Sequence, residues 1–248
     1  MTNVPDVPER SRLAWRHTPG RGPTLVFLCG YASDMNGTKV LALEEWARRS
    51  GRAFLRFDYA GCGESEGAFE DQTLASWRDD ALRVIDAVVE GPVVLAGSSM
   101  GGWVMLLVAK ARPEMVKAMV GIAAAPDFTD WGYSEAEKAA ILRDGRIEQP
   151  NDYGDTPTVT TRGFWASGEA NKVMTGPIGF DGPVRLLQGQ RDKEVPWERA
   201  LTLAELFRSD AVQTVLVKDG DHRLSREQDL ALIIRAVEDV LLLCSSSS

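Results

Sequence analysis

Short apolar runs alternate with amphipathic segments along most of the chain. Six runs are mostly apolar on both faces, as strands buried in a parallel sheet are, and they cover residues 24–29, 53–57, 92–97, 116–122, 184–187 and 212–217. Apolar positions at helical spacing follow them, over residues 38–49, 75–90, 100–111, 197–208 and 225–243. This alternation predicts an α/β fold with a mostly parallel central sheet and helices on both faces. We expect an antiparallel edge strand over residues 12–17.

Residues 127–182 interrupt the alternation. This segment is rich in Gly, Pro and Thr, and it contains a short helical pattern whose Ser134 and Glu137 stand at capping-box spacing. It is too long for a loop in a compact domain, so it predicts an inserted cap. Residues 1–248 then form a single domain with one cap insertion. The last helix is expected to begin with a second capping box, between Ser225 and Gln228.

Composition and charge narrow the possible partners. The chain carries 28 Lys and Arg against 36 Asp and Glu, and a net charge of -8 argues against a nucleic-acid partner. No apolar run approaches the ~18 residues that a membrane-spanning helix needs, and the N-terminal residues lack the apolar core of a secretory signal. Three cysteines at unrelated spacings favour neither disulfides nor a zinc site. We therefore expect a cytoplasmic protein without a metal or stable membrane insertion, or a mitochondrial matrix protein if the chain is a processed form.

The sequence GSSMG at residues 97–101 fits the G-x-S-x-G pattern of a nucleophile elbow. A nucleophile on a sharp strand-to-helix turn needs small residues two positions before and two positions after it. Of the two serines, Ser99 alone has glycines at both places, Gly97 and Gly101. The motif also follows a predicted strand and opens an apolar helix, as an elbow must. Ser99 is therefore the predicted nucleophile, and the alternative is a tight turn whose serine merely caps the helix.

A serine nucleophile needs a base and an acid that orients the base. The chain has two histidines, and His222 follows the last predicted strand, whereas His17 precedes all the parallel ones. In this fold the order along the chain is Ser, Asp or Glu, then His, so His222 is the predicted base. Asp192 follows the predicted strand over residues 184–187 and is the predicted acid. Asp127 also follows a strand and is the alternative.

Backbone N–H groups and a set of aromatic side chains complete the predicted site. An oxyanion hole needs two such donors, and we expect them from Met100, after the nucleophile, and from Tyr31, after the turn at Gly30. Large apolar side chains in the elbow helix and the cap suggest a hydrophobic acyl pocket. The candidate substrate-binding residues are Trp103, Phe128, Trp131, Phe164 and Trp165.

These residues together resemble the α/β-hydrolase superfamily over residues 25–243. Within it the chain is similar to the abhydrolase-domain palmitoyl-protein thioesterases of mitochondria, a family that also deacylates acyl glucuronides. The resemblance is carried by the strings GYASDMNGTK at 30–39, RFDY at 56–59, GSSMGGW at 97–103, VPW at 195–197 and DHR at 221–223. It implies a serine thioesterase or esterase with Ser99, Asp192 and His222 as the triad.

The resulting interpretation is a serine hydrolase that cleaves carboxylic thioesters or esters through an acyl-enzyme, as an acyl-protein thioesterase or carboxylesterase does. The chemistry requires no cofactor, and the expected substrates are small molecules or acylated proteins. One alternative is an esterase for acyl glucuronides or other small esters. Another is a binding protein without hydrolytic activity on the same scaffold, which a burst of nitrophenol from a short-chain ester would distinguish.

Overall fold

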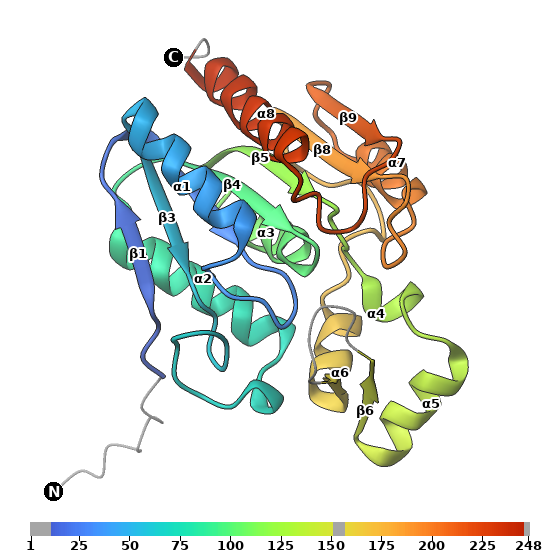
Figure 1. Cartoon of the computed structure of the whole chain (residues 1–248). Helices are drawn as coiled ribbons and strands as arrows, with labels where there is room; N and C mark the ends of the chain where they lie inside the picture. Colours follow the sequence, from blue (N-terminus) through green and yellow to red (C-terminus); the bar gives the residue numbers. More distant parts are fainter. Residues whose placement is uncertain (1–10, 151–156, 246–248) are drawn as a thin grey trace, which may run out of the picture.

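A seven-stranded sheet forms the centre of the computed structural model, which describes residues 11–150 and 157–245 (Figure 1). The strands follow the order β1-β3-β2-β4-β5-β8-β9, and β1 pairs antiparallel with β3 while the other pairs are parallel. Their bounds are β1 Trp15–Thr18, β2 Arg21–Leu28, β3 Arg52–Phe57, β4 Val93–Ser98, β5 Val116–Ile122, β8 Val184–Gly189 and β9 Val212–Val217. The predicted α/β fold and its antiparallel edge are confirmed.

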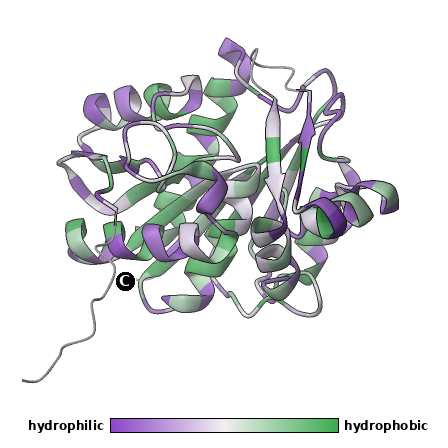
Figure 2. Ribbon diagram, turned by 90° about the horizontal axis from the view of Figure 1, so that it is seen from below, coloured by the Kyte–Doolittle hydropathy of each residue, from purple (hydrophilic) through white to green (hydrophobic). Residues whose placement is uncertain are grey.

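Helices cover both faces of this sheet. On one face α1 (Thr38–Ser50) lies beside α8 (Glu227–Ser245), and on the other α2 (Leu74–Val88) lies beside α3 (Met100–Ala111) (Figure 1). The short α7 (Glu198–Leu206) connects β8 to β9. Figure 2 shows the consequence, with hydrophobic residues concentrated in the strands and hydrophilic ones on the outer parts of the helices. All six residues of β4, the middle strand, are buried.

The strand order explains where a site can form. From β2 the chain crosses to β3 on one side, and from β3 it returns past β2 to β4 on the other side. The order therefore reverses between β2 and β4. The connections after these two strands run to opposite faces of the sheet and leave a crevice at the carboxyl ends of the strands. Open α/β sheets bind their ligands in this crevice. The loop after β2 and the turn after β4 both reach this crevice.

The segment between β5 and β8 lies largely outside the sheet, below it in Figure 1. Its described residues form three helices and an antiparallel pair of strands, namely α4 (Phe128–Trp131), α5 (Glu135–Asp144), β6 (Arg146–Gln149), β7 (Thr158–Thr161) and α6 (Arg162–Ala170). The predicted capping box of α5 is confirmed, because Ser134 Oγ accepts from Glu137 N and the Glu137 carboxylate accepts from Ser134 N. We refer to this segment as the cap. Its standing as an insertion into a single domain stays a prediction.

The last helix begins later than predicted. It starts at Glu227, and the Ser225 hydroxyl donates to the carbonyl of Arg223 instead of capping the helix. Asp229, in the first turn, provides the contact at this end of the helix instead, since its carboxylate accepts from the backbone N–H and the guanidinium of Arg226. The predicted capping box of Ser225 and Gln228 is therefore wrong. A buried carboxylate next to an arginine forms stronger, charge-assisted hydrogen bonds than a serine hydroxyl does.

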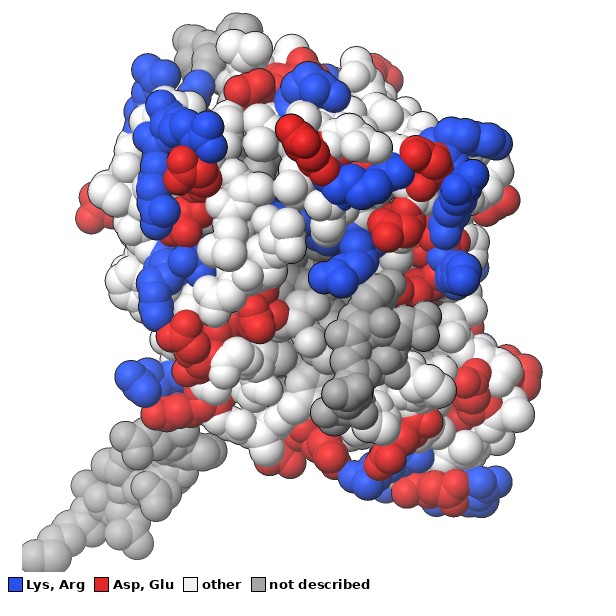
Figure 3. Space-filling view, viewed as in Figure 1, with Lys and Arg blue, Asp and Glu red and all other residues white. Residues whose placement is uncertain are grey.

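Two further observations concern the described residues. None of their helices combines the length and the apolar character needed to cross a membrane. Within the same residues, no group of three His, Cys, Asp or Glu side chains is placed to hold a metal ion. On the face drawn in Figure 3, Lys and Arg alternate with Asp and Glu instead of forming one basic surface.

Candidate active site

Ser99 occupies a sharp turn between β4 and α3. Its backbone is in a left-handed region, at φ 53° and ψ -121°, which is costly for a residue with a side chain. The turn is closed by backbone hydrogen bonds, from Ser99 N to Ile122 O and from Ala125 N to Ser99 O, both at 3.0 Å. A Cβ on Gly97 would overlap the backbone of Gly101, so the first glycine of the motif is required by close backbone contact. The elbow geometry that the sequence predicts is present.

A continuous line of hydrogen bonds starts at Ser99. Its Oγ lies 3.1 Å from Nε2 of His222, and Nδ1 of His222 lies 2.8 Å from Oδ2 of Asp192. His222 comes from the loop between β9 and α8, and Asp192 from the loop after β8. The Asp192 side chain is fully buried and that of His222 is 12% exposed, so water competes little for these contacts. The structure therefore brings together the three residues predicted as a triad.

Several donors converge on the Asp192 carboxylate. Besides His222, it accepts from Gln188 Nε2 at 2.8 Å and from the backbone N–H groups of Glu194 and Val195 at 2.8 and 2.9 Å. Burial acts to raise the pKa of Asp192, but the hydrogen bonds and the proximity of His222 outweigh it, and the pKa lies below its usual value. Asp192 is therefore held as a carboxylate facing the imidazole. Sequence reasoning missed Gln188, whose only signal is a polar residue inside an apolar strand.

The alternative acid, Asp127, has a different task. Its carboxylate accepts from the backbone N–H groups of Val173 and Met174, both at 2.8 Å, where the chain returns from the cap. Burial raises the pKa of Asp127 above its usual value. His17, the other histidine, lies in β1 at the edge of the sheet, paired with Leu55. Neither residue belongs to the hydrogen-bond line at Ser99.

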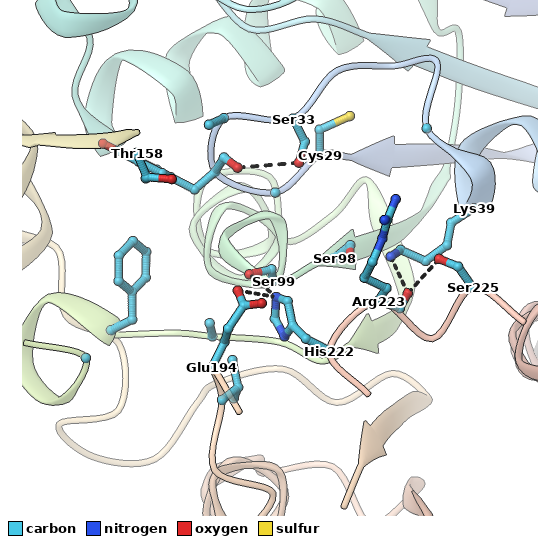
Figure 4. A pocket seen from close by; sticks show the side chains of 18 of the residues that line it. Cys29, Ser33, Lys39, Ser98, Ser99, Thr158, Glu194, His222, Arg223 and Ser225 are labelled. Atoms are coloured by element: carbon cyan, nitrogen blue, oxygen red, sulfur yellow. Dashed lines mark hydrogen bonds and ion pairs between the residues drawn. The ribbon is translucent and has the colours of Figure 1, made fainter. Parts of the chain in front are cut away.

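Glu194 is a second carboxylate beside the imidazole. Its Oε2 lies 3.4 Å from His222 Nε2, and the side chain is 44% exposed at the surface of the cleft (Figure 4). This places a negative charge on the side of His222 that faces Ser99. Glu194 could not be predicted from the sequence, because an exposed Glu in a loop has no distinguishing pattern.

The backbone of Tyr31 and that of Met100 both lie beside Ser99. Met100 is the first residue of α3, so its N–H has no acceptor within the helix. Tyr31 follows Gly30, where an added Cβ would lie 3.4 Å from the Cβ of Ser99, so this loop passes directly beside the elbow. The Tyr31 hydroxyl donates to the carbonyl of Val159 in β7 at 2.6 Å. The predicted role of both N–H groups as oxyanion donors stays a prediction.

Asp58 forms hydrogen bonds that stabilise the loop that carries Tyr31. This fully buried carboxylate accepts from Met35 N at 2.7 Å and from Glu64 N at 2.8 Å, which joins the loops after β2 and β3. Gly63 has a φ of 51°, and a Cβ there would overlap the Asp58 carboxylate. The glycine-rich turn after β3 therefore allows this carboxylate to reach both loops.

Ser99 and His222 open onto a cleft of about 680 Å³ between the sheet and the cap. Two of the five predicted substrate-binding residues, Phe128 and Trp131, line it. Their contact with a substrate stays a prediction. Polar and charged side chains line the side away from the cap, among them Lys39, Arg223 and Ser225 (Figure 4).

The other three predicted substrate-binding residues do not line this cleft. Trp103 is fully buried and donates to the carbonyl of Asn171, and Phe164 is buried in ring contacts with Tyr31 and other aromatics. Trp165 donates to the carbonyl of Thr129. Trp103 joins the elbow helix to the cap, and Trp165 joins two parts of the cap to each other. Their aromatic character reflects packing, which the sequence pattern did not distinguish from ligand contact.

Comparison with known proteins identifies the family. The model of the alpha/beta hydrolase family matches residues 25–244. Human palmitoyl-protein thioesterase ABHD10, mitochondrial, is 38% identical over 243 residues, which cover 96% of this chain and 78% of the human one. The mouse protein of the same name is 39% identical over 238 residues, which cover 94% and 80%. The expectation of a cytoplasmic protein finds no support in these relatives, whose names place them in mitochondria.

Solved structures give the same result. The alpha/beta hydrolase domain-containing protein 10 from mouse superposes with a TM-score of 0.87 at 37% identity, covering 97% of this chain and 96% of that one. A protein from Agrobacterium vitis S4 superposes with a TM-score of 0.90 at 38% identity, covering 96% of each chain. Both similarities extend over the sheet, the elbow and the cap. The chain belongs to the α/β-hydrolase family, and it is a hydrolase related to proteins named as thioesterases.

Proposed function

We propose that the chain is a serine hydrolase that cleaves thioesters or esters of medium and long acyl groups through an acyl-enzyme on Ser99. The observation that carries this proposal is the hydrogen-bond line from Ser99 Oγ through His222 to Asp192, which opens onto the cleft. A buried carboxylate, an imidazole and a hydroxyl in this order are what nucleophilic acyl transfer requires.

Each step follows from this arrangement. Nε2 of His222 accepts the Ser99 proton as Oγ attacks the carbonyl carbon, and Asp192 stabilises the imidazolium that results. The N–H groups of Tyr31 and Met100 donate to the oxyanion of the tetrahedral intermediate. His222 then returns the proton to the departing alcohol or thiol. In the second half, water loses a proton to His222 and attacks the acyl carbon. The bond from that carbon to Ser99 Oγ then breaks, Oγ takes the proton back from His222, and the carboxylic acid is released.

The acyl preference rests on the cap side of the cleft. Phe128 and Trp131 present apolar surface there, and burial of each acyl methylene in such a site contributes up to ~0.8 kcal/mol. The relatives named palmitoyl-protein thioesterase support a long acyl group and a thioester. Their mitochondrial names support the matrix as the compartment of this chain. Acylated proteins and small acyl thioesters are both suitable substrates for a cleft of this kind.

Labelling with a fluorophosphonate tests the nucleophile. We expect one labelled peptide that contains Ser99, no label on the Ser99→Ala variant, and normal labelling of the matched Ser98→Ala variant. The wild type and the Ser98→Ala variant should hydrolyse an octanoyl or palmitoyl thioester, and the Ser99→Ala variant should not. Label on Ser98, or thioester hydrolysis that survives Ser99→Ala, contradicts the proposal. Binding of the thioester without any turnover favours the non-hydrolytic alternative.

A further inference from the structure

Glu194 lies beside the imidazole nitrogen that faces Ser99. Its Oε2 is 3.4 Å from His222 Nε2, and Ser99 Oγ is 3.1 Å from the same nitrogen. The three side chains point toward one another at the edge of the cleft, which all three residues line (Figure 4). The Glu194 side chain is partly exposed, so its carboxylate meets both the imidazole and the water of the cleft.

The backbone of Glu194 is held by the carboxylate that contacts the other side of the imidazole. Glu194 N donates to Asp192 Oδ1 at 2.8 Å, and Asp192 Oδ2 lies 2.8 Å from His222 Nδ1. A backbone hydrogen bond of 2.8 Å, from Arg191 N to Gly220 O, joins the loop after β8 to the loop that carries His222. Short contacts through a buried carboxylate therefore fix where the Glu194 side chain starts relative to the imidazole.

The pair of Glu194 and His222 Nε2 is suited to a water molecule. When the Nδ1 proton of a neutral imidazole is donated to Asp192, Nε2 is an acceptor, and so is the Glu194 carboxylate. Two acceptors that face each other repel unless a donor lies between them, and water has two hydrogens to donate. A carboxylate has about four acceptor positions, so Glu194 can accept from a water while its other contacts stay in place.

We propose that Glu194 positions the water that hydrolyses the acyl-enzyme on Ser99. The inference rests on the proposed function, because it concerns the second half of that reaction. After the leaving group has departed, a water occupies the space beside His222 Nε2. It donates one hydrogen to Nε2 and the other to Glu194 Oε2, and this directs a lone pair of its oxygen at the acyl carbon.

Glu194 orients this water and does not take its proton. As the water oxygen bonds to the acyl carbon, Nε2 of His222 takes one hydrogen as a proton, and the other stays on the oxygen that becomes part of the carboxylic acid. The bond between the acyl carbon and Ser99 Oγ then breaks, and Oγ takes the proton from Nε2. In acylation, the ester oxygen or thioester sulfur that occupies this space has no hydrogen to donate to Glu194. The contribution of Glu194 is therefore specific to deacylation.

Single turnovers of 4-nitrophenyl octanoate, with the enzyme in excess, measure the two halves separately. Release of nitrophenol reports acylation, and loss of the octanoyl group from the Ser99 peptide, followed by rapid quenching and mass spectrometry, reports deacylation. Glu194→Met keeps the length of the side chain but removes the acceptor. We expect its deacylation rate constant to fall at least ~10-fold, as loss of a charge-assisted hydrogen bond to the reacting water predicts. Its acylation rate constant should stay within ~3-fold of the wild type, so octanoyl-Ser99 accumulates.

Two further variants serve as comparisons. Glu194→Gln keeps an acceptor oxygen without the charge, so its deacylation rate constant should fall less than that of Glu194→Met. Glu198→Met makes the same replacement at an exposed position in the first turn of α7, four residues further along the chain. It should leave both rate constants at the values of the wild type.

Three results would overturn the inference. One is a Glu194→Met variant that deacylates as fast as the wild type or accumulates no octanoyl-Ser99. Another is an equal loss in acylation and deacylation, which would mean that the carboxylate acts only on the imidazole. The third is the same loss of deacylation in Glu198→Met. Failure of the proposed function is distinct, because the wild type would then release no nitrophenol that depends on Ser99 and would form no adduct on it.

Discussion

Replacement of Asp192 by Asn tests which carboxylate orients the imidazole. Oδ2 of Asp192 lies 2.8 Å from both His222 Nδ1 and Gln188 Nε2, and Oδ1 accepts from the N–H groups of Glu194 and Val195. An Asn side chain has one carbonyl oxygen, so in either orientation its NH₂ group faces two former donors. The backbone N–H groups have no alternative form, whereas the imidazole can move its proton to the other nitrogen.

The orientation that keeps the two backbone hydrogen bonds is therefore favoured. It takes one acceptor from Gln188 Nε2, which still lies 3.3 Å from the carbonyl oxygens of Gly189 and Val195. The opposite orientation leaves both backbone N–H groups without an acceptor, and each such donor costs about 1–3 kcal/mol. In the favoured orientation the NH₂ group donates to His222 Nδ1, which places the ring proton on Nε2. That tautomer does not accept the proton of Ser99. The same replacement in a serine protease lowers kcat ~10⁴-fold, or about 5.5 kcal/mol, and we expect a loss of at least ~10²-fold here.

The assay measures kcat with a neutral octanoyl thioester near pH 7. The measurement is repeated at higher pH, where hydroxide assists the reaction. Asp127→Asn is a matched control, because the Asp127 carboxylate also accepts from two backbone N–H groups but does not contact His222. It should cost less than ~10-fold in kcat and lower the melting temperature to a degree similar to Asp192→Asn. A nearly normal Asp192→Asn with a severely impaired Asp127→Asn would refute this reasoning.

Other contacts lead to further expected outcomes. A series of acyl thioesters should show kcat/KM rising with chain length until the cleft is filled, by up to ~0.8 kcal/mol per methylene, and a flat series contradicts an apolar acyl site. Tyr31→Phe removes the hydrogen bond to Val159 in the cap; it should lower kcat more than it changes KM and weaken binding of a trifluoromethyl ketone, and unchanged inhibitor affinity would show that this contact does not position the oxyanion loop. Gly102→Ala would place a Cβ against Ala124, so a loss of about 1–3 kcal/mol in unfolding free energy is expected, and an unchanged melting temperature contradicts it. The pKa of Asp192 is lowered in the folded protein, so its stabilising contribution is present above the unfolded value of about 3.9 and is lost as the pH falls through the folded value; a variant without this carboxylate should lose less stability on acidification, and equal losses would count against the argument.

Local patterns in the sequence determined the elements and the predicted nucleophile. The ranges predicted at 100–111, 116–122 and 212–217 are those observed, because an apolar run between clear breaks admits one element. The elbow was readable because the close approach of Gly97 to Gly101 is a contact between near neighbours in sequence. Chain order then restricted the base to His222. The resemblance of the motif strings added the family, which the comparisons establish independently.

Tertiary structure decided what depends on residues distant in sequence. Asp192 and Asp127 both follow parallel strands, and the choice between them came from the sheet order, since β8 lies next to β9, whose loop carries His222, and β5 lies one strand further away. The aromatic side chains of the cap divided into Phe128, which lines the cleft, and Phe164, which packs inside, according to contacts that no local pattern encodes.

The contact between Lys39 and the loop of His222 was equally hidden. Lys39 and Arg223 are 184 positions apart, and they meet because α1 and α8 cover the same face of the sheet. Periodicity and capping act over one or two turns and can be read along the chain. The polarity of a binding site is set by which strands are neighbours and how helices cross them, and these follow from the packing of the whole chain.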